Sequence, residues 1–205
     1  METWEIKGGT LEYDDETHTY IYEGLILPSI TQILKLRFGR KYDGVDSNVL
    51  SRAAQRGTEV HKAIENLCKT GEVEDLKEVR NFLFLQKHYG FKVVDNELPV
   101  VLFVDNIPIA CGRLDLVLEI NNQLYLGDIK RTSELDKEYL GFQLNLYRIA
   151  YQQCYGQVIK GLRGLHLRED KRKFVPIPIK EDMAWELINE YLEEGDGSDE
   201  IEGRF

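Results

Sequence analysis

Cysteine is scarce in this 205-residue sequence, and long apolar runs are absent. Its three cysteines, Cys68, Cys111 and Cys154, are widely spaced and form no C-x-x-C pair. This argues against structural disulfides and against zinc or iron–sulfur sites, and it is typical of a reducing cytosol. No apolar run approaches the roughly 20 residues that cross a bilayer, and the first residues lack a signal-peptide pattern. We therefore expect a cytoplasmic protein with no membrane partner.

Positive charge is also in deficit, with 26 Lys and Arg against 36 Asp and Glu and a net charge of −10. Residues 181–205 alone carry a balance of −9, so the preceding 180 residues are close to neutral. Residues 30–62 carry a balance of +4. A basic segment on a near-neutral body is compatible with contacts to phosphate groups.

The length and composition predict one folded domain over residues 1–192. Residues 1–45 form a β-rich and loop extension in this prediction, and residues 46–180 form the core. The acidic residues 193–205 are predicted to be a disordered tail.

The centre of the sequence, residues 96–132, predicts three consecutive strands. Apolar runs cover residues 100–104, 107–120 and 124–129. Asp105-Asn106 and Asn121-Asn122 separate these runs, and such pairs are typical of two-residue turns. We expect a meander.

Charged residues interrupt these apolar runs. Asp115 lies within the second run, and Asp128 and Lys130 end the third as Gly-Asp-Ile-Lys. Because side chains alternate between faces along a strand, Asp128 and Lys130 project from the same face. Two carboxylates and an ammonium group on one sheet face suit a hard divalent cation with a water beside it. The alternative is a solvated ion pair at the end of a strand.

Residues 50–68 predict a helix, since apolar or small residues recur at helical spacing and Gly71 follows as a stop. Gly57 within it costs roughly 1 kcal/mol of helix propensity, which indicates close backbone packing there. His61 lies one turn after Gly57, beside the apolar stripe. It is either a core histidine with satisfied hydrogen bonds or, beside the two acidic strand residues, a metal ligand through a neutral ring nitrogen.

The remaining segments predict further elements around this centre. Helices are expected over residues 73–89, 136–155 and 181–192, strands over 157–167 and 173–179, hairpins within 1–30, and a mobile loop over 38–48. Ser29 is a candidate N-cap of a short helix, and Pro176 and Pro178 place the last strand at a sheet edge. The fold class is therefore α/β (α+β), with the order helix, strand, strand, strand, helix, strand and extra β elements at both ends.

Four segments combine these residues into motifs in a fixed order. They are residues 56–65 (RGTEVHKAIE), 112–115 (GRLD), 127–130 (GDIK) and 143–147 (QLNLY). They resemble the R-G-T-x-V-H-x-x-I-E helix, the G-x-x-D strand, the D-x-K strand and the Q-x-x-x-Y helix of the PD-(D/E)XK nuclease superfamily, in its RecB-like and phage-exonuclease branch. Residues 18–20 and 27–34 are similar to the H-x-Y and P-S-(V/I)-T-x-I-L segments of phage-encoded relatives.

The resemblance covers roughly residues 18–180 and implies a restriction-endonuclease-like core, with a central mixed sheet flanked by helices. It also implies a site for one Mg²⁺ or Mn²⁺, held by His61, Asp115, Asp128 and the backbone carbonyl of Ile129. A histidine ligand favours Mn²⁺ more than an all-oxygen site would. Glu97 is an additional candidate ligand for a second metal, or else a solvated residue at a strand start. The cysteines of the iron–sulfur subgroups are absent, so we expect no iron–sulfur cluster.

The same resemblance implies catalytic roles for Lys130, Asp115, Asp128, Gln143 and Tyr147. Lys130 would orient the attacking water and stabilise its deprotonated form, or neutralise charge on the phosphate. Gln143 and Tyr147 would support the site and touch the nucleic-acid backbone, although a tyrosine such as Tyr147 is by itself more often a core residue than a site residue. Candidates for contacts to nucleic-acid phosphates, with solvated side chains as the alternative, are Arg40, Lys41, Arg52, Arg56 and Arg131.

The function implied is a metal-dependent DNA exonuclease that acts from the ends of linear DNA, in phage or prophage recombination and repair. A single-strand annealing protein or recombinase is an expected partner, and small exonucleases of this superfamily can form homo-oligomers. Three alternatives stay open: a structure-selective endonuclease on the same fold, a non-catalytic DNA-binding module, and a soluble α+β protein of another role whose motif match is accidental. The presence of His61, Asp115, Asp128 and Lys130 argues against the module, because a retired site would have lost at least one of them.

Overall fold

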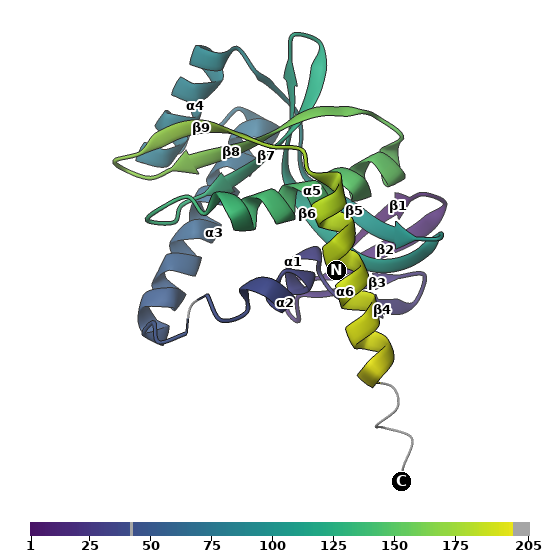
Figure 1. Ribbon diagram of the computed structural model, residues 1–205. Helices are drawn as coiled ribbons and strands as arrows, with labels where there is room; N and C mark the ends of the chain where they lie inside the picture. The colour runs from purple at the N-terminus through teal and green to yellow at the C-terminus, as the bar shows by residue number, and fades with distance from the viewer. Residues whose placement is uncertain (42, 199–205) are drawn as a thin grey trace.

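A computed structural model describes residues 1–41 and 43–198, and within them the protein is a mixed α+β fold with two β-sheets (Figure 1). Its strands are β1 (Glu2–Ile6), β2 (Gly9–Asp14), β3 (Thr19–Tyr22), β4 (Leu25–Leu27), β5 (Lys92–Val104), β6 (Ile107–Ile120), β7 (Gln123–Lys130), β8 (Ile159–Leu167) and β9 (Arg172–Ile177). Its helices are α1 (Ile30–Ile33), α2 (Lys35–Phe38), α3 (Ser47–Thr70), α4 (Lys77–Tyr89), α5 (Lys137–Tyr155) and α6 (Glu181–Ser198). Strands β1–β4 form one sheet and β5–β9 the other, each in sequence order. No helix of this described part is long and apolar enough to cross a bilayer.

Two tight turns shape the larger sheet. Both residues of Asp105-Asn106 and of Asn121-Asn122 have positive φ angles, between 49° and 65°. Two successive residues with such angles are what a two-residue type I′ turn requires. The expected meander β5–β6–β7 is confirmed as antiparallel, and β8 then pairs parallel to β7 after crossing over through α5. Strand β9, which contains Pro176, lies at the sheet edge as predicted.

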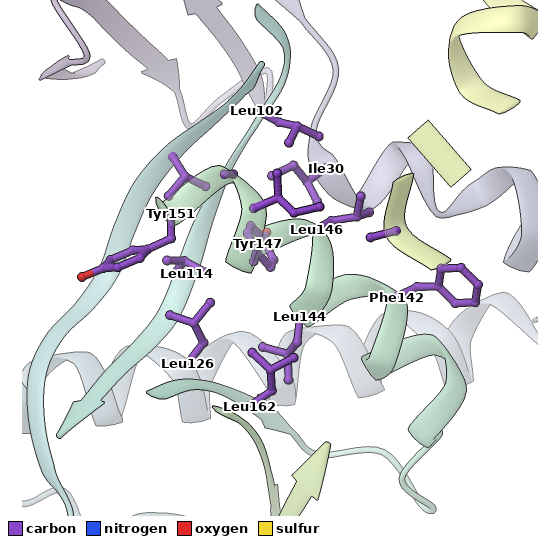
Figure 2. Packing of buried hydrophobic residues seen from close by; sticks show 14 of the residues in the cluster. Ile30, Leu102, Leu114, Leu126, Phe142, Leu144, Leu146, Tyr147, Tyr151 and Leu162 are labelled. Atoms are coloured by element: carbon purple, nitrogen blue, oxygen red, sulfur yellow. The ribbon is translucent and has the colours of Figure 1, made fainter. Parts of the chain in front are cut away.

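Helices cover both faces of this sheet. Helix α5 packs against one face, and α3 and α4 pack against the other. Figure 2 shows Leu114, Leu126 and Leu162, from three neighbouring strands, meeting the side chains of α5 with the Tyr147 ring among them. Each fully buried leucine contributes roughly 1.5–3 kcal/mol, so packing rather than helix propensity holds α5 in place.

The N-terminal sheet packs against β5 and β6. Residues of the two sheets form one apolar cluster, in which Leu11 and Tyr22 lie with Val101 and Phe103. The backbone N–H of Cys111 donates to the Pro28 carbonyl at 2.9 Å, which ties the end of this sheet to β6. Ser29 caps α1 as predicted, through a capping box with Gln32.

Several element boundaries differ from the sequence prediction. Strand β5 begins at Lys92, eight residues before the apolar run 100–104. Helix α3 begins inside the predicted loop 38–48, because the Asp46 carboxylate accepts from the first backbone N–H groups of the helix. Helix α4 begins at Lys77 rather than at residue 73. Helix α6 runs to Ser198, so residues 193–198 of the predicted disordered tail are helical, and residues 199–205 lie outside the described residues. Glu193 and Glu194 are good helix formers that continue the helix past its last buried turn.

The interpretation of Gly57 was wrong, and another glycine has the role assigned to it. A Cβ at Gly57 would meet no atom within 4 Å beyond its own helix backbone, and Ala53 and Ala54 before it are exposed. A Cβ at Gly112 on β6 would lie 2.8 Å from the Tyr147 ring. The glycine of the G-x-x-D segment therefore makes room for the tyrosine of the Q-x-x-x-Y segment.

These two glycines predict opposite effects of the same substitution. Gly57→Ala should raise the free energy of unfolding by about 0.5–1 kcal/mol, because alanine is the better helix former and meets nothing. Gly112→Ala should lower it by about 1–3 kcal/mol, because Tyr147 must move. Urea unfolding of the two variants measures both, and effects of the same sign would contradict this account.

Candidate metal centre

The strand register sets three carboxylates side by side. The β5–β6 register puts Glu97 opposite Asp115, and continuing the β6–β7 register by one residue puts Asp128 on the other side of Asp115. Directly opposite residues of antiparallel strands have Cβ atoms about 4.5–5.5 Å apart. Acidic residues that are 31 positions apart along the chain thus meet because three adjacent strands carry them.

Helix α3 brings His61 to this row. The Nδ1 atom of His61 lies 3.7 Å from Asp115 Oδ2 and 3.8 Å from Glu97 Oε1. Its Nε2 atom lies 3.1 Å from the backbone carbonyl oxygen of Ile129. His61 is therefore more than a packed core residue, because both of its ring nitrogens face polar groups of the sheet.

His61, Glu97 and Asp115 form what we call the metal triad. One ligand atom from each lies within 4.8 Å of the others. A divalent cation with oxygen ligands at about 2.0–2.6 Å can touch three atoms only if they lie within roughly 5 Å of one another, and the triad meets this condition. The donor set of two carboxylates and an imidazole fits Mg²⁺, Mn²⁺ or another divalent metal and does not choose among them.

Two features of the backbone hold the triad in place. The Ile129 N–H donates to Asp115 Oδ2 at 2.7 Å, which fixes that carboxylate. Glu97 has a φ of 49°, a left-handed conformation that is costly for a residue with a side chain, and it follows a bulge in β5 between Val93 and Asp95. Strained backbone of this kind concentrates at functional sites, which supports a role for Glu97.

Asp128 and Lys130 form an ion pair next to the triad. Lys130 Nζ lies 2.6 Å from Asp128 Oδ2, and the Asp128 side chain is only 2% exposed. Burial raises the pKa of Asp128 to about 6, although the ammonium of Lys130 acts against this. Burial would lower the pKa of Lys130, but the Asp128 and Asp115 carboxylates outweigh it and raise that pKa. Lys130 is therefore charged at neutral pH.

The metal triad differs from the ligand set that the resemblance implied. His61 and Asp115 are in it, and Glu97 completes it. Asp128 is not in it, because its carboxylate faces Lys130. The Ile129 carbonyl contacts the His61 ring, and so it lies at the edge of the same site.

Gln143 and Tyr147 lie behind the site on α5. Each is only 6% exposed, so in this structure neither is open to a nucleic-acid backbone, contrary to that part of the expectation. Tyr147 packs against Gly112, three residues before Asp115. The buried Oε1 of Gln143 has no hydrogen-bond partner in the described residues. A buried acceptor without a hydrogen bond costs roughly 1–3 kcal/mol of stability. Such a cost is tolerated where a ligand or a water supplies the missing hydrogen bond.

The basic residues expected to contact phosphates fall into two groups. Arg56 and Arg131 both face the fully buried carboxylate of Glu78, at 3.6 and 2.7 Å, so each has a structural partner. Lys41 pairs with Asp136 at 2.7 Å. The remaining two, Arg40 and Arg52, are exposed.

Arg113 belongs to the site and was missed by sequence reasoning. Its Nε lies 3.8 Å from Glu97 Oε2, and its guanidinium lies 4.8 Å from the centre of the Tyr13 ring. The signal was present, because Arg113 stands two residues before Asp115 on one strand and so shares its face. Tyr13 comes from the N-terminal sheet, and the core motifs do not predict where that sheet packs.

Two hollows flank these residues. A pocket of about 620 Å³ lies between β1, α3 and β5, and Glu97 and Arg113 are part of its wall. A smaller one of about 40 Å³ adjoins Lys130, with Tyr139 and Asp136 on its other side. Of the triad, Glu97 thus borders the larger pocket, and of the ion pair, Lys130 borders the smaller one.

The geometry predicts different metal affinities for variants of two neighbouring carboxylates. Glu97→Gln should weaken Mn²⁺ binding by at least about tenfold, because it removes a member of the triad. Asp128→Asn should weaken it less, because that carboxylate holds Lys130. Calorimetric titration with Mn²⁺ measures both, with Glu119→Gln on the far end of β6 as the control. A larger effect at Asp128 would restore the ligand set that the resemblance implied.

The protonation of His61 predicts that metal binding depends on pH. Burial alone would lower the pKa of His61, but Asp115 and Glu97 outweigh it and raise the pKa to about 9. A cation must displace that proton, so Mn²⁺ affinity should rise between pH 7 and 9, by up to about tenfold per pH unit. Titrations in buffers of different ionisation enthalpy measure the proton released. His61→Asn should bind more weakly and lose this dependence, whereas His88→Asn should keep it; an affinity insensitive to pH in the unaltered protein would contradict the assignment.

Comparisons with known proteins add little to this geometry. No family model matches the chain, and no curated protein matches it. A crystal structure of a protein named SSO0001 is similar, with 15% sequence identity, a TM-score of 0.46, and coverage of 80% of this chain and 74% of that chain. At this identity and score, the likeness carries no conclusion about fold family or function.

Proposed function

We propose that this chain is a divalent-metal-dependent nuclease with the restriction-endonuclease-like core of the PD-(D/E)XK superfamily, and that it hydrolyses DNA from its ends. One observation carries the proposal. Glu97 and Asp115 of the metal triad and the Lys130–Asp128 pair occupy neighbouring positions of three adjacent strands, and His61 reaches them from α3. Asp115, Asp128 and Lys130 are also the defining residues of the G-x-x-D and D-x-K segments.

His61, Glu97 and Asp115 would hold the cation in this proposal. A divalent cation supplies Lewis acidity that lowers the pKa of a water and offsets negative charge on a phosphate. Arg113 faces the second oxygen of the Glu97 carboxylate, Oε2, while His61 faces Oε1. The Ile129 N–H fixes Asp115, so the chain itself keeps two of the three ligands oriented.

Lys130 is the residue that faces the reacting groups in this proposal. Its side chain is 22% exposed and adjoins the small hollow beside α5. Its charged ammonium donates hydrogen bonds where a phosphate oxygen or an attacking water would lie. Asp128 keeps the ammonium in place and is itself too buried to meet substrate. Lys130 at this pKa is a donor rather than a general base.

The test is an incubation of the purified protein with linear and with covalently closed circular duplex DNA, in Mn²⁺, Mg²⁺ or EDTA. We expect metal-dependent loss of the linear substrate alone. Asp115→Asn should abolish cleavage and keep DNA binding, because it removes a triad ligand and leaves the core intact. Lys130→Ala should slow cleavage by about 10²-fold or more with little change in Mn²⁺ affinity. Lys160→Ala is the matched control, because Lys160 is an exposed lysine at the other end of the sheet.

Each other outcome revises the proposal in a defined way. Cutting of the closed circle would identify an endonuclease on the same fold. DNA binding without cleavage of either substrate would favour a non-catalytic module. Normal turnover by Lys130→Ala would remove the role given to that residue.

A further inference from the structure

Aromatic rings and guanidinium groups form a continuous row on the face of the sheet that α4 covers, apart from the metal triad. We call it the α4–β9 ladder. Its members are Phe84, His88 and Tyr89 from α4, Arg172 and Phe174 from β9, Arg163 from β8 and Tyr125 from β7. Figure 1 shows α4 lying beside β9 at this edge of the molecule.

The contacts run without a break from helix to strand. The Arg172 guanidinium lies 3.7 Å from the centre of the Phe84 ring, and the His88 ring stacks on Phe84 at 5.6 Å with an angle of 10° between the planes. His88 meets Tyr89 at 4.8 Å, and Tyr89 meets Phe174 at 4.7 Å. Four aromatic rings and a guanidinium group thus contact one another in series: Phe84 and His88 are stacked, Tyr89 meets His88 edge-on, and Phe174 is buried at the strand end of the series.

The ladder is open to solvent where it crosses α4. Phe84 is 42% exposed and Tyr89 is 44% exposed, which is high for large apolar rings. Arg172 and His88 are also exposed. Packing alone does not require these rings to be outside, because α4 buries Val79, Phe82 and Leu85 on its other side.

The arginines of the ladder are not neutralised by the protein. Neither Arg163 nor Arg172 forms an ion pair with a carboxylate in the described residues. Arg37 provides the contrast, because it also lies over an aromatic ring, that of Phe142, but pairs with Glu190. The exposed, unpaired guanidinium of Arg172 lies beside the exposed Phe84 ring, and Arg163 adds a second unpaired guanidinium over the less exposed rings of Tyr125 and Phe174. In a chain of net charge −10, this combination indicates a partner that is both anionic and aromatic.

Single-stranded nucleic acid has this chemistry. Its bases stack on aromatic rings and on guanidinium planes, and its phosphates pair with arginine. A duplex hides the faces of its bases and offers phosphates alone. An acidic peptide would pair with the arginines but would leave the rings unused.

Helix α4 also contacts the segment that follows Lys130. Arg131 follows Lys130 directly and binds Glu78 at the start of α4. Asn81, one turn later, donates to the Arg168 carbonyl in the β8–β9 turn. From Glu78 to Phe84 the helix rises only about 9 Å. Helix α4 therefore contacts Arg131 at its start and carries the ladder rings farther along.

We propose that the α4–β9 ladder binds single-stranded nucleic acid by base stacking and phosphate pairing. This binding does not depend on the proposed nuclease function, because none of the triad residues belongs to the ladder.

The test measures binding of a fluorescently labelled oligothymidylate, and of a blunt duplex of the same length, by anisotropy in EDTA. Phe84→Leu and Arg172→Gln should each weaken single-strand binding by about tenfold, with little effect on the duplex. Arg172→Gln should also lower the slope of log K against log salt by about 0.7. Arg37→Gln is the control. Arg37 also lies over an aromatic ring but already pairs with a carboxylate, so its removal should change neither the single-strand affinity nor the salt slope.

Other results would overturn the inference. Unchanged single-strand binding in the Phe84→Leu, Arg172→Gln double variant would reduce the ladder to surface packing. Equal losses for single strand and duplex would make it a phosphate site without base recognition. Self-association that the double variant abolishes, with oligonucleotide binding unchanged, would make it a protein interface. Cleavage in Mn²⁺ is scored separately, so ladder-dependent binding without any cleavage would reject the nuclease function and keep this inference.

Discussion

Two-residue turns at Asp105-Asn106 and Asn121-Asn122 hold β5, β6 and β7 in one register, and the candidate site depends on that register. A slip of one residue would require each turn to be rebuilt and would move Asp115 to the opposite face of the sheet. The same slip would expose the leucines that these strands bury under α5. The hydrophobic core therefore enforces the alignment of Glu97, Asp115 and Asp128, although it contains none of them.

The charges at the site balance within the chain. Three carboxylates would repel one another in a partly buried place, and three cations offset them: His61 beside Asp115, Lys130 against Asp128 and Arg113 against Glu97. A buried charge without a partner is costly. Conformations in which one member of a pair turns away therefore have a higher free energy than the paired arrangement. The positive side chains thus pre-position oxygen ligands that would otherwise separate, and a cation that enters has only a proton on His61 to displace.

Patterns that are local in sequence could be predicted, and partnerships across the chain could not. Alternation and turn pairs located the meander and the charged residues Asp115, Asp128 and Lys130, and helical spacing located α5. Arg56 and Arg131 were candidates for phosphate contacts with solvated side chains as the alternative. Their common partner, Glu78, could not be foreseen, because it is distant in sequence and is buried only once the fold has formed. Gly57 was interpreted as a packing position because a helix pattern does not show which of its turns meets the sheet. The membership of Glu97 in the triad needed the exact strand pairing.

Helix α3 combines two halves with different surroundings, and this bears on how the protein opens locally. From Ser47 to Gln55 its side chains are exposed or nearly so, and the Asp46 cap is the main contact that holds its start. From Val60 onward Ala63 and Ile64 are buried against the sheet. Backbone amides of the first half should exchange with solvent through local fraying, whereas those of the second half require opening of the core. His61 lies in the second half, so the first turns can unfold and refold without moving the ring away from the strands.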